Sequence, residues 1–108
     1  MKQILLIATG GTIASKSTER GLAPQISAEE IIGYIPSAKE FCQIDTAAPF
    51  NLDSTNVNSR HWLELARLIE KKYEYYDGFV ICHGTDTMAY TAAALSYLIQ
   101  NNRKPVVI

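Results

Sequence analysis

Two hydroxyl-rich turns hold the side chains of this sequence that are best suited to chemistry. Residues 9–15 (TGGTIAS) and residues 83–87 (HGTDT) each follow an apolar run. A threonine hydroxyl attacks a carbonyl carbon only with help from a neighbouring base, and the carbonyl oxygen then needs hydrogen-bond donors as it gains charge. Thr12 after one strand, with Thr85 and Asp86 after a neighbouring one, meets what acyl transfer from an amide requires.

An open parallel sheet would bring the two turns together. In such a sheet the carboxyl ends of the strands border the crevice in which ligands bind. The glycines of both turns permit a sharp change of direction and a close approach of a ligand to main-chain amides. We therefore predict that the strand beginning near Lys2 pairs in parallel with the strand ending at Cys82, so that Thr12 and Thr85 lie at the same edge of the sheet.

Apolar strands alternate with helical patterns along the chain, which is typical of a doubly wound α/β fold with a mostly parallel sheet. We expect strands at about residues 2–8, 41–45, 79–82 and from 105 onward, and helices at about 27–35, 58–73 and 87–101. The polar segments 15–25 and 46–57 are predicted to be loops. A doubly wound sheet would continue past residue 108, so we expect the front part of a larger domain.

Capping and apolar spacing define the first two helices. Ser27 followed by Glu30 forms a capping box, Pro36 ends that helix, and Asn58 or Ser59 caps the next one. The expected apolar sides are Ile31, Ile32 and Ile35 in the first helix, and Trp62, Leu65, Ala66 and Ile69 in the second.

The composition argues against several kinds of partner and site. The net charge is −1, and no basic stripe indicates nucleic-acid binding. No apolar run approaches the roughly 20 residues that span a bilayer, so we expect no membrane partner. Glycines end the first apolar run early, which favours a buried strand over a signal peptide. Cys42 and Cys82 lack metal or redox spacing and are interpreted as free, buried thiols in a reducing cytoplasm.

The two turns also resemble the paired signatures of the bacterial-type L-asparaginases. The matching segments are residues 8–14 (ATGGTIA) and 83–89 (HGTDTMA). Residues 53–55, 76–81 and 104–108 fit the family too, so the resemblance spans the whole chain. It implies that residues 1–108 form the N-terminal portion of the family's catalytic domain, with the remainder of that domain and a C-terminal domain absent.

The resemblance implies a role for each candidate site residue. Thr12 corresponds to the nucleophile that forms an acyl-enzyme, and Thr85 to a member of a second catalytic group that positions water or substrate. Asp86 corresponds to the carboxylate that pairs with the substrate's α-ammonium. Ser54 matches the serine that holds the α-carboxylate, and Thr55 lies beside it. The implied reaction converts L-asparagine to L-aspartate and ammonia without a metal or an organic cofactor.

Two departures and one branch feature refine this resemblance. The lysine of the family's second catalytic group has no counterpart here, so residues 1–108 alone are expected to be inactive. Leu22 lies where many members carry a tyrosine in a mobile loop, and Thr55 replaces a glutamine, as in the cytoplasmic type I branch. The resemblance also implies a homodimer or homotetramer for the complete protein.

Simpler explanations exist for each candidate residue. Thr9 and Thr12 could satisfy main-chain groups of a tight turn, and Thr9 is better interpreted as structural. Thr85, Asp86 or Thr87 could cap the helix that follows. His83 is interpreted as a packed, hydrogen-bonded residue, His61 as a surface or capping residue, and Trp62 as a packing group.

Two other functions remain open from the residues. One is an asparaginase-like subunit that supplies ammonia to a tRNA-dependent amidotransferase, which would ordinarily carry an extension before the first strand, whereas Lys2 enters it directly. The other is a non-catalytic amino-acid-binding module. The sequence that follows Ile108 would discriminate among them, because the enzyme needs a downstream lysine motif.

Overall fold

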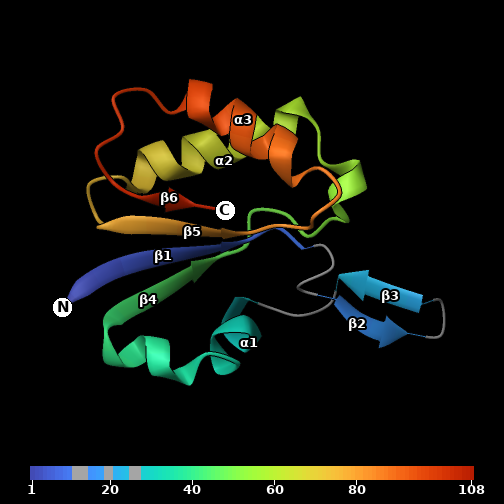
Figure 1. Ribbon diagram of the computed structural model, residues 1–108, viewed down its shortest axis with the longest axis horizontal. Helices are drawn as coiled ribbons and strands as arrows, with labels where there is room; N and C mark the ends of the chain where they lie inside the picture. Colours follow the sequence, from blue (N-terminus) through green and yellow to red (C-terminus); the bar gives the residue numbers. More distant parts are fainter. Residues whose placement is uncertain (11–14, 19–20, 25–27) are drawn as a thin grey trace.

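A sheet of four parallel strands forms the centre of the molecule (Figure 1). The computed structural model describes residues 1–10, 15–18, 21–24 and 28–108. The strand order is β4-β1-β5-β6, and the bounds are β1 Lys2–Ala8, β4 Cys42–Ala47, β5 Gly78–Cys82 and β6 Val106–Val107. β1 pairs in parallel with β5 from Ile4 opposite Gly78 to Ala8 opposite Cys82, which confirms the predicted pairing.

Helices cover both faces of the sheet, as a doubly wound fold requires (Figure 1). The α-helices are α1 Ala28–Gly33, α2 Ser59–Lys72 and α3 Met88–Leu98, and the short 3₁₀ helices are η1 Pro36–Glu40 and η2 Ser54–Asn56. α2 and α3 lie on one face and α1 on the other. The chain steps from β1 to β4 in one direction and to β5 and β6 in the other. Right-handed crossovers in opposite directions place helices on opposite faces, and the change of direction beside β1 marks where such folds bind ligands.

The core lies between the sheet and the helices α2 and α3. Its buried members are Leu5, Ile7, Leu65, Ile69, Phe79, Ile81 and Leu95. Leu6 of β1 is also buried, and because strand side chains alternate it faces the side of α1. Burial of β1 on both faces explains its continuous apolar sequence. None of the helices that the structure describes combines the length and apolar character needed to cross a membrane.

The first two helices begin and end close to the predicted places. Asn58 caps α2, since its side chain accepts the main-chain N–H of Arg60, and the Nδ1 atom of His61 accepts the N–H of Asn58 at 3.0 Å. His61 is therefore a capping residue, as expected. The helix α1 ends at Gly33, and Pro36 begins η1. Ile35 lies two residues after the end of α1 and is 47% exposed, so its assignment to the apolar side of that helix was wrong.

Two further expectations need correction. The segment 15–25 was predicted to be a loop, but β2 Ser15–Thr18 and β3 Gly21–Pro24 form an antiparallel hairpin beyond the carboxyl ends of the main strands (Figure 1). Main-chain hydrogen bonds define such a ladder, and the segment lacks the apolar alternation that predicts a strand. The expected Ser27 cap lies outside the described residues. Cys42 and Cys82 are free, as expected, but half-buried rather than buried.

Gly10 allows the chain to leave β1 beneath a neighbouring loop. Its φ of +95° belongs to the left-handed region, which favours glycine. A Cβ atom at this position would lie 2.6 Å from the carbonyl oxygen of Leu52 and 2.7 Å from Oδ1 of Asn51. The loop that leads into Ser54 can therefore pack this closely only against a glycine.

We expect Gly10→Ala to lower the free energy of unfolding by more than about 1 kcal/mol, because the backbone would be strained and the 51–52 segment displaced. Gly33→Ala is the matched control, since a Cβ at Gly33 meets nothing within 4 Å. Denaturant unfolding of both variants measures the difference. Equal stability of the two variants would contradict this assignment.

Candidate functional site

The segments that follow β1 and β5 lie side by side. Thr9 donates its main-chain N–H and its hydroxyl to the carbonyl of Cys82, at 3.2 and 2.8 Å. The carbonyl of Thr9 in turn accepts the N–H of Leu52 at 2.8 Å. Thr9 is 1% exposed, so its contacts join three segments of main chain. The structural interpretation of Thr9 agrees with these contacts.

Thr12, the predicted nucleophile, lies among residues 11–14, outside the described residues. The parallel pairing that was to bring its turn beside Thr85 is confirmed by the register of β1 and β5. Its own position relative to Thr85 stays a prediction. The nearest described residue of the first turn is Gly10, two positions before it.

Ser54 and Asp86 are brought together, although 32 positions separate them in the sequence. The Oγ atom of Ser54 accepts the main-chain N–H of Asp86 at 3.2 Å, and the hydroxyl of Thr87 donates to the carbonyl of Ser54 at 2.7 Å. We call these two contacts the Ser54 clasp. Ser54 is 3% exposed, and a hydroxyl that accepts one N–H still has its own proton to donate to another partner.

The remaining predicted residues border the clasp. Thr55 is exposed, and its N–H is bound by the carboxylate of Asp53 at 3.2 Å, which shapes the turn around Ser54. Thr85 and Asp86 are exposed between β5 and α3. An exposed carboxylate and a buried hydroxyl therefore lie at the carboxyl ends of the central strands.

Thr87 occupies the start of α3 but, within the described part of the chain, does not act as the side-chain cap that the simpler explanation of this turn requires. Thr87 occupies the N-cap position of α3, yet among the described residues its side chain makes no capping hydrogen bond. Its hydroxyl instead reaches Ser54. This contact was missed because nothing in the sequence pairs residue 87 with a loop 33 positions earlier.

His83 is a buried, hydrogen-bonded residue, as interpreted from the sequence. It is 2% exposed; its Nδ1 lies 2.6 Å from the carbonyl of Gly84, and its Nε2 lies 2.9 Å from Oγ1 of Thr91. Thr91 also accepts the indole N–H of Trp62 at 3.0 Å. The polar role of Trp62 and the presence of Thr91 were both missed. The spacing of Thr87 and Thr91, one helical turn apart, is the signal in the sequence that could have found the second.

The half-buried Cys82 at the end of β5 is a poor candidate for a nucleophile. Burial raises the pKa of its thiol above the ordinary value, which makes the reactive thiolate scarcer near neutral pH. Within the described part of the chain, no three His, Cys, Asp or Glu side chains gather in a way that could hold a metal ion.

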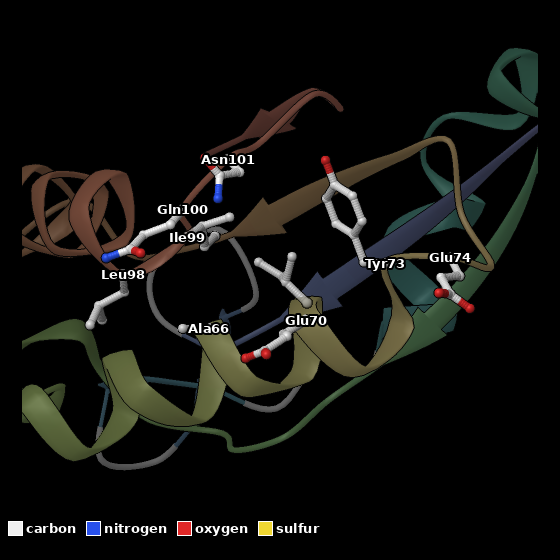
Figure 2. A pocket seen from close by; sticks show the side chains of 9 residues that line it. Ala66, Glu70, Tyr73, Glu74, Leu98, Ile99, Gln100 and Asn101 are labelled. Atoms are coloured by element: carbon white, nitrogen blue, oxygen red, sulfur yellow. The ribbon is translucent and has the colours of Figure 1, made fainter.

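A pocket of about 380 Å³ lies away from both turns, between the C-terminal ends of α2 and α3 (Figure 2). Its lining includes Ile69, Tyr73 and Ile99, with the carboxylate of Glu70 at its border. Helices that connect parallel strands run opposite to them, so these helix ends lie at the amino ends of the strands. The pocket therefore belongs to a different part of the molecule from the Ser54 clasp.

One family model matches almost the whole chain, and the similar proteins are of two kinds. The family model described as asparaginase, N-terminal, matches residues 3–108. The L-asparaginase of Thermococcus kodakarensis is 42% identical over 107 residues, which cover 98% of this chain and 33% of that protein. A glutamyl-tRNA(Gln) amidotransferase subunit of Archaeoglobus fulgidus is 41% identical over 109 residues, covering 99% of this chain and 26% of that relative.

Solved structures share the fold as well. The thermostable L-asparaginase from Thermococcus kodakarensis aligns with a TM-score of 0.85 over 96% of this chain and 32% of its own. A probable cytoplasmic L-asparaginase from Campylobacter jejuni, 36% identical, aligns with a TM-score of 0.77 over 88% of this chain and 28% of its own. The chain thus spans between about a quarter and a third of the length of these relatives.

The Ser54 clasp can be tested without reference to any substrate. We expect Ser54→Ala to speed hydrogen exchange at the Asp86 amide and to lower the free energy of unfolding by about 1 kcal/mol, because that N–H loses its acceptor. Ser96→Ala is the control, since its exposed hydroxyl donates to the Ala93 carbonyl of its own helix. Unchanged exchange at Asp86 in Ser54→Ala would show that the clasp does not hold the turn.

Proposed function

The chain belongs to the asparaginase family, and we propose that its protein hydrolyses the side-chain amide of L-asparagine to give L-aspartate and ammonia. The observation that supports this most directly is the Ser54 clasp, which holds Ser54 against Asp86 beside the end of β1. Because the chain spans between about a quarter and a third of its relatives' length, the activity is proposed for the full-length protein. Residues 1–108 are proposed to be the N-terminal portion of its catalytic domain.

We assign recognition of the substrate to Asp86, Ser54 and Thr55. The Asp86 carboxylate would accept charge-assisted hydrogen bonds from the α-ammonium, and the hydroxyl of Ser54 would donate to the α-carboxylate, with Thr55 beside it. The ammonium and carboxylate of an amino acid are bonded to the same carbon. Their binding groups must therefore lie near each other, and the contact of the Ser54 hydroxyl with the main-chain N–H of Asp86 supports this pairing.

The proposed chemistry uses Thr12 as the nucleophile. Its oxygen would form a bond to the side-chain carbonyl carbon, the carbon–nitrogen bond would break, and the hydroxyl proton would leave with the nitrogen as ammonia. Water would then hydrolyse the acyl-enzyme, which releases aspartate and restores the threonine. Thr85 would position that water or the substrate. We propose no metal or organic cofactor for these steps.

The rest of the full-length protein is proposed to complete the site. The family's second catalytic group includes a lysine with no counterpart in residues 1–108, so we expect these residues alone to release little ammonia. We also propose a homodimer or homotetramer. A cytoplasmic location is proposed from the likeness to the Campylobacter jejuni structure.

A second candidate function is that of a subunit in a glutamyl-tRNA(Gln) amidotransferase, and the Archaeoglobus fulgidus relative favours it. Such a subunit would supply ammonia for amidation of a glutamyl-tRNA rather than for release. Ammonia release from L-asparagine by the purified full-length protein, measured with and without glutamyl-tRNA and partner subunits, separates the two functions. A requirement for the tRNA complex would favour the amidotransferase.

The roles of Thr12 and Asp86 differ in the step that each affects. We expect Thr12→Ala in the full-length protein to lower kcat by about a thousandfold or more while aspartate binding changes by less than about threefold, because only the attacking oxygen is lost. Asp86→Ala should weaken aspartate binding by about tenfold or more, through the loss of a charge-assisted contact. Single-turnover kinetics and calorimetric titration with aspartate measure both effects.

Thr12→Ser serves as the matched control because it keeps the hydroxyl, and it should retain far more turnover than Thr12→Ala. A Thr12→Ala enzyme with near-normal turnover would rule out the proposed nucleophile. Intact aspartate binding by Asp86→Ala would rule out the ammonium contact.

A further inference from the structure

A chain of hydrogen bonds that is half-buried at Trp62 and buried at His83 leads from helix α2 to the second turn. The indole N–H of Trp62 lies 3.0 Å from Oγ1 of Thr91, which lies 2.9 Å from Nε2 of His83. The other ring nitrogen of His83 lies 2.6 Å from the carbonyl oxygen of Gly84. We call these contacts the Trp62 relay. Its two central members are almost fully buried, with exposures of 0% for Thr91 and 2% for His83.

The end groups of the relay fix the direction of its two outer hydrogen bonds, and a neutral His83 fixes the third. The indole of Trp62 can only donate, so Oγ1 of Thr91 accepts. The carbonyl of Gly84 can only accept, so Nδ1 of His83 carries a proton and donates. A neutral His83 that is protonated at Nδ1 has a free acceptor at Nε2, so the remaining hydroxyl proton of Thr91 is donated to that atom. In this arrangement the buried His83 and Thr91 and the half-buried Trp62 all have hydrogen-bond partners.

The relay ends one peptide bond before a predicted catalytic residue. The Gly84 carbonyl and the Thr85 N–H belong to the same planar peptide unit. A hydrogen bond that holds the carbonyl therefore also sets the orientation of the Thr85 N–H. The relay connects this unit to α2 through Trp62 and to α3 through Thr91. Both helices are packed on the sheet through the core, which includes Leu65 and Leu95.

The Ser54 clasp holds the same turn at a different point. It binds the N–H of Asp86 and the hydroxyl of Thr87, whereas the relay binds the carbonyl of Gly84. Thr85 is exposed and lies between the two points of attachment. One attachment therefore lies on the side of the catalytic threonine, and the other on the side of the substrate-binding carboxylate.

We propose that His83, Thr91 and Trp62 are positioning residues, which hold the Gly84–Thr85 peptide in place and so direct the Thr85 hydroxyl toward the reacting groups. None of the three touches substrate in this assignment. The inference rests on the proposed function, and it assigns different roles to the two sets of contacts that hold the turn. The relay serves the chemical step through Thr85, and the clasp serves substrate binding through Asp86.

Variants of Thr87, the N-cap residue of α3, and of Thr91 within α3 separate these roles in the full-length protein. We expect Thr91→Val to lower kcat about tenfold with KM changed by less than about threefold, because misplacement of a catalytic group acts on the transition state. Thr87→Val should mainly raise KM, since it loosens Ser54 beside Asp86. Thr91→Ser keeps the hydroxyl and should restore most of the lost kcat. Trp62→Phe, which removes only the first donor, should have a smaller effect in the same direction as Thr91→Val.

A loss of stability must not be mistaken for a loss of positioning. Leu95→Ala is the control, because Leu95 is a buried residue of the same helix that belongs to the core and not to the relay. It should lower the melting temperature while leaving kcat close to that of the parent at temperatures where both are folded. Wild-type kcat in folded Thr91→Val, or an equal loss of kcat in Leu95→Ala, would overturn the proposal.

The histidine tautomers give a test that does not depend on activity. Nitrogen-15 spectra of the labelled full-length protein under mildly alkaline conditions should show His83 protonated at Nδ1. They should show His61 protonated at Nε2, since its Nδ1 accepts the N–H of Asn58. The variants His83→Gln and His61→Gln assign the signals. A His83 protonated at Nε2 would overturn the relay whatever the substrate.

The same measurements distinguish failure of the inference from failure of the proposed function. A full-length protein that has the predicted tautomers but releases no ammonia from L-asparagine would refute the function alone. In that case the relay is decided by the Thr85 amide resonance, which Thr91→Val should shift more than Leu95→Ala does. An active enzyme with the wrong His83 tautomer would refute the inference alone.

Discussion

Thr9 donates both its main-chain N–H and its hydroxyl to the carbonyl of Cys82, and so carries the pairing of β1 with β5 past the ends of the strands. This contact depends on the register in which Ala8 lies opposite Cys82. A shift by one residue would turn the side chains of a strand to the opposite face. The buried Leu5 and Ile7 would then leave the core. The register that packs the core is therefore the same register that places the two turns side by side.

The turns themselves are held mainly through main-chain groups. Gly10 lets the 51–52 segment approach closely, the Ser54 clasp binds the N–H of Asp86, and the Trp62 relay binds the carbonyl of Gly84. The side chains of Thr85 and Asp86 are therefore presented to solvent from a fixed backbone. Groups fixed before substrate arrives need less reorganisation when charge develops, which is how preorganised sites promote reactions.

The sequence predicted the parts of this structure that follow from apolar spacing and missed those that follow from polar contacts over long distances. The continuous apolar run of β1 and the helical spacing of Leu65 and Ile69 located the central elements. The hairpin of β2 and β3 was missed because its sequence lacks the apolar alternation that predicts a strand. The contact of Thr87 with Ser54 and the role of Thr91 were missed because a threonine at the start or middle of a helix has many common roles, and only the fold reveals the partners of these two.

The central claim is that Ser54 and Asp86 together recognise an α-amino acid at the carboxyl ends of β1 and β5. A crystal structure of the full-length protein with L-aspartate tests it most directly. We expect the α-ammonium at the carboxylate of Asp86, the α-carboxylate at the hydroxyl of Ser54, and the side-chain carboxylate within reach of the Thr12 hydroxyl. Aspartate bound elsewhere, or bound here with neither Ser54 nor Asp86 in contact with it, would contradict this claim.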